Sequence, residues 1–193
     1  VPTDPVFRTH RLDSGGTRLC RGQSVLSNFI SVAVDPGDGR RICAQNGATS
    51  LAGPFELQYV DGTFGRGVWG PYRRALGRRI AVGTNDVFFV DGTGLGAVAR
   101  PGNVNERRLV NLPKAWDLAV DNHAVYVSAF DSTAVAPIVR YDLLTRRSRS
   151  IGSYRGILSI AANAGALWAG TDRGELLRID QAAGAVRARV RPG

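Results

Sequence analysis

Short runs of apolar and polar residues alternate along most of the chain, and this period of two predicts β-strands rather than helices. Three pairs of such runs are each joined by a turn rich in Gly, Asn, Asp or Ala, which predicts three β-hairpins. The paired runs are residues 80–82 with 87–90, 118–120 with 125–128, and 158–160 with 167–170. The hairpins recur at offsets of 38 and 40 residues, so the chain repeats one structural unit.

Each unit continues into two further strands. Residues 138–142 align with 176–180 at an offset of 38, and both runs end in an aspartate, Asp142 or Asp180. We expect each carboxylate to accept backbone N–H bonds in the turn that follows. Fourth strands and a weaker upstream copy complete the pattern, at residues 148–151, 185–190, 29–34, 40–43 and 55–60.

Four-stranded units at this spacing are typical of β-propellers, in which sheets pack side by side because none can bury both faces alone. We therefore expect one all-β domain over residues 1–193. It is a small β-propeller, or a propeller-like array of four-stranded antiparallel sheets, with about four to five blades. The candidate blades are residues 29–62, 78–112, 116–152 and 156–191.

Residues 1–28 are expected to form an irregular N-terminal segment with one strand, at 6–12. That strand could pair with residues 186–190 and close the ring. Alternatively the ring is open, or a second copy of the chain covers the edge of the last sheet, since exposed edges invite pairing.

The last unit carries a recognisable motif. An apolar-Trp strand at Leu167-Trp168 is followed by a Gly/Asp turn, an Arg178-Ile179-Asp180 strand, and a Gly-containing turn into a Val-rich strand. This pattern resembles the repeats of streptogramin-lyase-like propellers, and the resemblance covers roughly the C-terminal half of the chain. In actinobacterial sequences such repeats often form extracytoplasmic sensor domains of membrane-anchored Ser/Thr protein kinases, so the resemblance implies a sensor domain of that kind.

The lyase activity of that family does not carry over to this chain. Family lyases use a His-centred site with a bound divalent metal. Here His123 falls in a hairpin turn and His10 in the N-terminal strand, and no second His or matched carboxylate occupies the equivalent turns. We expect no catalytic residue, no metal site and no cofactor; the alternative is a propeller lyase or hydrolase acting at the central axis.

The chain is basic, with 25 Lys and Arg against 16 Asp and Glu and a net charge of +9. Arg187, Arg189 and Arg191 alternate with apolar residues in the last strand, which places their charges on one face. This charge could attract anionic cell-envelope polymers, or it could be a solvated surface. We do not expect nucleic acid as a partner, because no nucleic-acid-binding signature accompanies the arginines.

The two cysteines, Cys20 and Cys43, are candidates for a disulfide. An intra-chain bond would stabilise the fold by about 3 kcal/mol in the chain-entropy model. An extracytoplasmic location would permit it. An inter-chain bond and two reduced thiols are the alternatives.

The chain starts at Val1, contains no Met, and has no run approaching the roughly eighteen apolar residues of a membrane span. We interpret it as a domain of a longer protein or a mature product, tethered to a membrane through another part of that protein.

Residues 64–72 are rich in Gly, Arg and aromatic residues and show no clear alternation. Phe64, Arg66, Trp69 and Tyr72 are candidate contacts to a ligand or partner, since aromatic and Arg side chains are preferred anchors. A buried connection between blades is the alternative.

Together these features predict a non-catalytic, extracytoplasmic sensor or interaction domain, the ectodomain of a membrane-anchored bacterial receptor Ser/Thr kinase. It would act by binding a small ligand or cell-envelope component, or by homodimerisation. The alternatives are the propeller lyase or hydrolase, and a binding module for anionic cell-envelope polymers that uses the arginines of the last strand.

Overall fold

The structure is a computed structural model of the chain. It describes the backbone and side chains of residues 79–99, 106–163 and 165–191, and the backbone of strands β1 to β6 before residue 79. The described residues form strands and turns, arranged as four-stranded antiparallel sheets and one two-stranded hairpin. The predicted all-β, propeller-like array is therefore confirmed. Among the described residues, no helix is long and apolar enough to cross a membrane.

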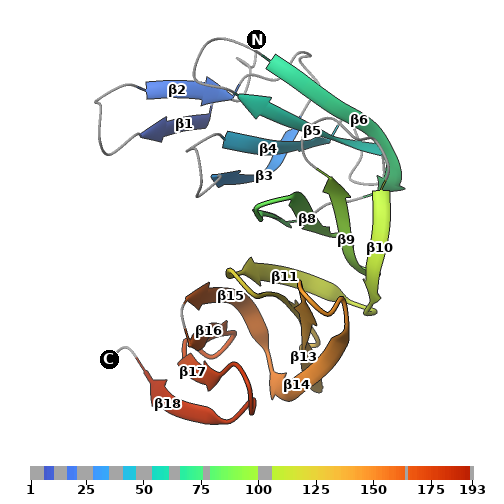
Figure 1. Cartoon of the computed structure of the whole chain (residues 1–193). Coiled ribbons are helices and arrows are strands. Elements are labelled where there is room, and N and C mark those ends of the chain that lie inside the picture. The colour runs from blue at the N-terminus through green and yellow to red at the C-terminus, as the bar shows by residue number, and fades with distance from the viewer. Residues whose placement is uncertain are drawn as a thin grey trace.

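Four sheets follow one another around an arc, each with its strands in sequence order (Figure 1). The first contains β3 (Asn28–Val34), β4 (Arg41–Asn46), β5 (Pro54–Val60) and β6 (Arg66–Ala75). The second contains β7 (Arg79–Val82), β8 (Asp86–Val90), β9 (Gly94–Ala99) and β10 (Glu106–Asn111). The third contains β11 (Ala115–Val120), β12 (Ala124–Ala129), β13 (Val135–Asp142) and β14 (Ser148–Arg155). The fourth contains β15 (Ile157–Asn163), β16 (Ala166–Thr171), β17 (Leu176–Asp180) and β18 (Val186–Val190).

The N-terminal segment differs from the single strand expected in residues 1–28. β1 (Phe7–His10) pairs with a second strand, β2 (Thr17–Cys20), in an antiparallel hairpin. A hairpin is favoured because a lone strand leaves its backbone N–H and C=O groups unpaired. The intervening sequence contains Ser14-Gly15-Gly16, residues that favour tight turns. β1 therefore does not complete the last sheet, where β18 pairs with β17 alone.

The first sheet extends to Ala75, beyond the boundary expected at residue 62, because β6 pairs with β5 as its outermost strand. Alternation along the sequence could not reveal this strand. Gly67, Gly70 and Pro71 interrupt the pattern, and the register between β5 and β6 shifts twice. Such shifts move side chains between faces and remove the period of two.

The hydrophobic core lies between neighbouring sheets, and the third sheet is covered on both faces. Every residue of β12 is buried. Val125 and Val127 belong to a cluster shared with the second sheet, whereas Ala124 and Tyr126 belong to a cluster shared with the fourth. This is the expected result of a strand whose successive side chains point to opposite faces.

The first strands of successive sheets contact one another, β3 with β7, β7 with β11, and β11 with β15. Two side chains of β11 form hydrogen bonds across its contact with β15. Trp116 donates its indole N–H to the carbonyl of Leu158 at 3.0 Å, and Asp117 accepts the backbone N–H of Ile160 at 2.8 Å. The third and fourth sheets are therefore joined by hydrogen bonds as well as by apolar contacts.

The fourth sheet buries one face and exposes the other. Leu177 and Ile179 pack against the third sheet, whereas Leu176 and Val190 are 41% and 51% exposed. The described array therefore ends at this sheet with an uncovered face.

Candidate binding site at one end of the sheets

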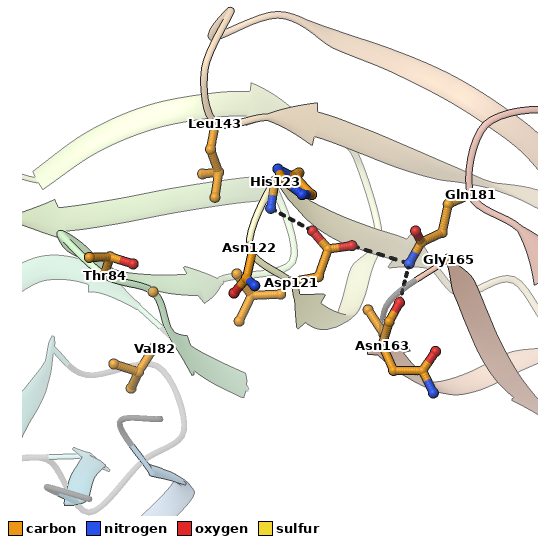
Figure 2. A pocket seen from close by; sticks show the side chains of 12 residues that line it. Val82, Thr84, Asp121, Asn122, His123, Leu143, Asn163, Gly165 and Gln181 are labelled. Carbon is orange, nitrogen blue, oxygen red and sulfur yellow. Dashed lines mark hydrogen bonds between the residues drawn. The ribbon is translucent and has the colours of Figure 1, made fainter. Parts of the chain in front are cut away.

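Turns from several sheets meet at one end of the array. In a four-stranded antiparallel sheet, the first turn and the third turn lie at the same end. The first turns, at 83–85, at 121–123 and between β15 and β16, therefore share an end with the third turns, at 143–147 and 181–185. These turns surround a pocket of about 330 Å³ (Figure 2).

We call this hollow the amide pocket, after the three amide side chains in its lining. The polar lining side chains come from four turns, and they are Thr84, Asp121, Asn122, His123, Asn163 and Gln181. The apolar part of the lining consists of Val82, Val120, Leu143 and Ala162. Sheets two, three and four thus all contribute to one cavity.

Asp121 anchors the pocket. Its Oδ1 accepts the backbone N–H groups of His123 and Ala124, both at 2.8 Å. Its Oδ2 accepts the hydroxyl of Tyr126 and the amide Nε2 of Gln181, both at 3.1 Å. Burial raises the pKa of Tyr126 to about 12, so the phenol keeps its proton and remains a donor at neutral pH. Both carboxylate oxygens are therefore committed to holding turns in place.

Gln181 links the third turn of the fourth sheet to its neighbours. Besides Asp121, its Nε2 lies 2.8 Å from the carbonyl oxygen of Asn163 (Figure 2). It also lies 3.1 Å from the carbonyl oxygen of Ala166. The bond to Asp121 crosses from the fourth sheet to the third. Nε2 carries two hydrogens, which these three oxygens share, so the amide is held in place before any ligand enters.

Three side chains at the pocket remain open for a ligand. Asn122, His123 and Asn163 are exposed, and their side chains make no hydrogen bond with the described residues. An amide group offers both donors and an acceptor, and an imidazole can offer either. The oxygens of Asp121 are already occupied by four donors, and the described lining residues include no Arg or Lys to attract an anion, so the pocket is suited to a neutral, hydrogen-bonding molecule.

The arginines singled out from the sequence lie elsewhere. Arg187 and Arg189 lie on β18, and Arg191 follows it. Arg187 pairs with Asp180 at 3.0 Å, and Arg191 pairs with Glu175 at 2.6 Å. Part of the predicted basic face is therefore neutralised within its own sheet.

The other predicted contact residues belong to the first sheet. Arg66, Trp69 and Tyr72 lie on β6, and Phe64 precedes it. Their side chains are outside the described residues, so their role as contacts stays a prediction.

The cysteines lie on separate sheets, Cys20 on β2 and Cys43 on β4. Their side chains are also outside the described residues, and the disulfide stays a prediction. Within the described residues, no three His, Cys, Asp or Glu side chains gather as a metal site.

Sequence reasoning placed His123 in a hairpin turn, as the structure has it, but it missed Asp121, Asn163 and Gln181 as a group. A signal existed, because Asn122 and Asn163 fall in the first turns of consecutive repeats. Their convergence with Gln181 depends on the packing of two sheets, which the repeat alone does not specify.

No protein-family model and no curated protein matches the chain. Solved structures do match in fold. A chain of the nidogen/laminin complex has a TM-score of 0.58 and 9% identity, covering 94% of this chain and 88% of that one. The computationally designed Ika4 protein has a TM-score of 0.59 and 15% identity, covering 82% and 94%.

Bacterial surface proteins also share the fold. The extracellular domain of a hybrid two-component system from B. thetaiotaomicron has a TM-score of 0.58 and 15% identity, covering 84% of this chain and 21% of that one. PorZ, a surface component of the type-IX secretion system of Porphyromonas gingivalis, has a TM-score of 0.59 and 14% identity, again covering 84% and 21%. These likenesses establish the fold alone, and the resemblance to streptogramin-lyase repeats stays a prediction.

Proposed function

We propose that the chain is a non-catalytic, extracytoplasmic binding domain that takes a neutral saccharide-like ligand in the amide pocket. The observation that carries this proposal is the convergence of Asn122, Asn163 and Gln181 around a cavity whose one acid is fully hydrogen-bonded. Side-chain amides match the hydroxyl and acetamido groups of sugars, and Val82 and Val120 offer apolar contact to the C–H faces of a sugar ring.

A binding role fits the pocket better than a catalytic one. A general base needs a group with an available lone pair and a partner that orients it. Both oxygens of Asp121 are committed to N–H and O–H donors, and the His123 side chain makes no hydrogen bond with a described carboxylate. No feature of the described residues favours the lyase or hydrolase alternative.

The extracytoplasmic location is supported by the surface and extracellular proteins that share the fold. The resemblance of the last repeat supports the finer proposal of a receptor Ser/Thr kinase ectodomain. Ligand binding or homodimerisation would then bring two tethered kinase domains together. The uncovered face of the fourth sheet, with Leu176 and Val190 exposed, is where a second copy could pack.

A calorimetric titration with a panel of neutral saccharides, starting with N-acetylglucosamine oligomers, tests the binding proposal. We expect binding that weakens about tenfold in Asn122→Ala and in Asn163→Ala, since each removes hydrogen bonds made only to the ligand. Asn111→Ala is the matched control, because Asn111 is exposed at the end of β10 and away from the pocket. Absence of binding to the whole panel, or an equal loss in the control, contradicts the proposal.

Sedimentation equilibrium across a concentration series tests homodimerisation separately. A reversible dimer that dissociates in Val190→Glu supports the finer proposal. A monomer at every concentration, with and without saccharide, contradicts the dimer while leaving the binding proposal to its own test.

A further inference from the structure

A second hollow lies at the opposite end of the third and fourth sheets. It forms where β14 leads into β15 and where the second turn of the fourth sheet leads from β16 to β17. Second turns lie at the other end from first and third turns. The hollow has a volume of about 250 Å³, and its charged lining residues are Arg155, Arg173, Glu175 and Arg189. We call it the Arg groove.

The backbone holds two of these arginines on neighbouring segments. The N–H of Asp172 donates to the carbonyl of Gly156 at 2.8 Å, which ties the second turn of the fourth sheet to the residue after Arg155. The hydroxyl of Thr171 accepts the N–H of Arg173 at 3.3 Å and so closes that turn. Arg155 and Arg173 are therefore brought to one groove by main-chain bonds, while their own side chains stay exposed.

The groove carries more positive than negative charge. Glu175 is buried, and Arg191 donates to its Oε1 through Nε at 2.8 Å. The Nη2 of Arg191 lies 2.6 Å from the same oxygen and completes the ion pair. Arg189 lies farther away, at 3.7 Å. The hydrogen bond from Arg191 lowers the pKa of Glu175, so this carboxylate is ionised and already matched. The guanidinium groups of Arg155 and Arg173 make no hydrogen bond or ion pair with the described residues.

We propose that the Arg groove binds the phosphate groups of an anionic ligand through Arg155, Arg173 and Arg189. A guanidinium group presents paired N–H donors that match two oxygens of one phosphate. Thr171 and Ser153 line the same groove and carry hydroxyl groups. The site is distinct from the amide pocket, and it does not depend on a ligand being bound there.

Tripolyphosphate is the first probe, titrated into the whole chain by calorimetry. We expect measurable binding that weakens about tenfold in the double variant Arg155→Ala/Arg173→Ala, because two charge-assisted contacts are lost. Arg178→Ala is the matched control. It removes one positive charge from an exposed position on β17, between Leu177 and Ile179, which are buried against the third sheet. No binding, or an equal loss in the control, overturns the proposal.

Glu175→Gln gives a change of opposite sign. It removes the competing negative charge, and we expect tripolyphosphate to bind more tightly, by about threefold or more. Weaker binding in a variant that still unfolds cooperatively overturns the proposal, because it would mean that the groove needs its acid. A parallel titration with a poly(glycerol phosphate) chain shows whether the bound phosphate groups belong to a polymer or to a small compound. Tighter binding per phosphate than tripolyphosphate points to a polymer, and equal binding points to a free phosphate compound; either supports the site.

Discussion

The two ends of the third and fourth sheets hold an acidic side chain in different ways. At the amide pocket, Asp121 is surrounded by neutral donors, namely backbone N–H groups, a phenol and a side-chain amide. At the Arg groove, Glu175 is held by the guanidinium group of Arg191. The first arrangement solvates the negative charge of Asp121 with neutral donors, whereas the second pairs Glu175 with Arg191 and lies among further arginines. One junction between sheets can therefore offer an amide-lined site with one acid at one end and a cationic site at the other.

The turns themselves explain the difference. Asp121 closes its own turn by accepting the N–H groups two and three residues ahead, which uses one carboxylate oxygen locally. In the second turn of the fourth sheet, the hydroxyl of Thr171 closes the turn by accepting the N–H groups of Arg173 and Glu175. The carboxylate of Glu175 takes no part in closing that turn, and it pairs with Arg191. A turn-closing acid can also pair with an arginine, as Asp180 does with Arg187. What distinguishes Asp121 is that its second oxygen meets a phenol and an amide instead.

The largest expected loss of stability comes from a substitution at Gly184, and Gly174 at the other end of the fourth sheet provides the comparison. A Cβ on Gly184, at the pocket end, would lie 1.4 Å from the carbonyl oxygen of Ile151 at a φ of +68°. A Cβ on Gly174, at the groove end, would meet nothing within 4 Å at a φ of +70°. We expect Gly184→Ala to lower the free energy of unfolding by about 4 kcal/mol, and Gly174→Ala by about 1 kcal/mol. Urea denaturation measures both, and similar losses would contradict the predicted close contact.

Asp121 gives the next largest effect. Asp121→Ala removes the partner of Tyr126 and Gln181 as well as two turn bonds, and we expect a loss of about 2–3 kcal/mol in the free energy of unfolding. Asp121→Asn keeps an oxygen for the backbone bonds, so we expect about half that loss. Thermal or urea denaturation measures both losses. Equal losses in the free energy of unfolding would mean that the two turn bonds contribute nothing, which contradicts the anchoring role of Asp121.

Binding at the Arg groove and binding at the amide pocket should differ in their dependence on salt. We expect raising the NaCl concentration from low to physiological to weaken tripolyphosphate binding by about tenfold, because screening acts on the arginines. Saccharide binding at the amide pocket should stay within about twofold, since the saccharide itself carries no charge. Parallel calorimetric titrations at two salt concentrations measure this, and a common salt dependence would remove the distinction between the ends.

Acidification tests Asp180 and Asp117, two carboxylates whose pKa values are shifted in opposite directions. Hydrogen bonds from the N–H of Ala183 and from Arg187 hold the pKa of Asp180 below its usual range, so its stabilisation is lost as the pH falls below about 4. Burial raises the pKa of Asp117 despite the N–H bond from Ile160, so ionised Asp117 lowers stability as the pH rises above about 4. We expect Asp180→Asn to flatten the loss of stability on acidification and Asp117→Asn to steepen it. Unfolding midpoints between about pH 2 and pH 7 measure both slopes.

The repeat pattern predicted most of the fold. It identified the hairpins of sheets two to four, and it predicted that Asp142 and Asp180 accept backbone N–H bonds in their turns, as they do. These features depend on residues close in sequence. Strand β6 was missed because glycine and proline interrupt its alternation. β2 was missed because its four residues, Thr17–Cys20, lie outside the repeat that revealed short strands such as β7.

The sites were less predictable because packing assembles them. Gln181 contacts Asp121, 60 residues earlier in the chain. Arg155 and Arg173 line one groove because a bond between Asp172 and Gly156 joins their neighbouring segments. Arg189 was named from the alternation of β18, but its nearness to Glu175 follows from the pairing of β17 with β18. A repeat reveals the sheets, whereas the surfaces where two sheets meet depend on contacts between repeats.

NMR tests saccharide binding at the amide pocket most directly. An N-acetylglucosamine oligomer is added to the isotope-labelled chain, and the side-chain amide signals are recorded at each step. We expect the NH₂ signals of Asn122, Asn163 and Gln181 to shift together to saturation, while the Nε–H signals of Arg155 and Arg173 stay in place. Amide signals that do not move, or shifts that centre on the two arginines instead, would contradict saccharide binding at the amide pocket.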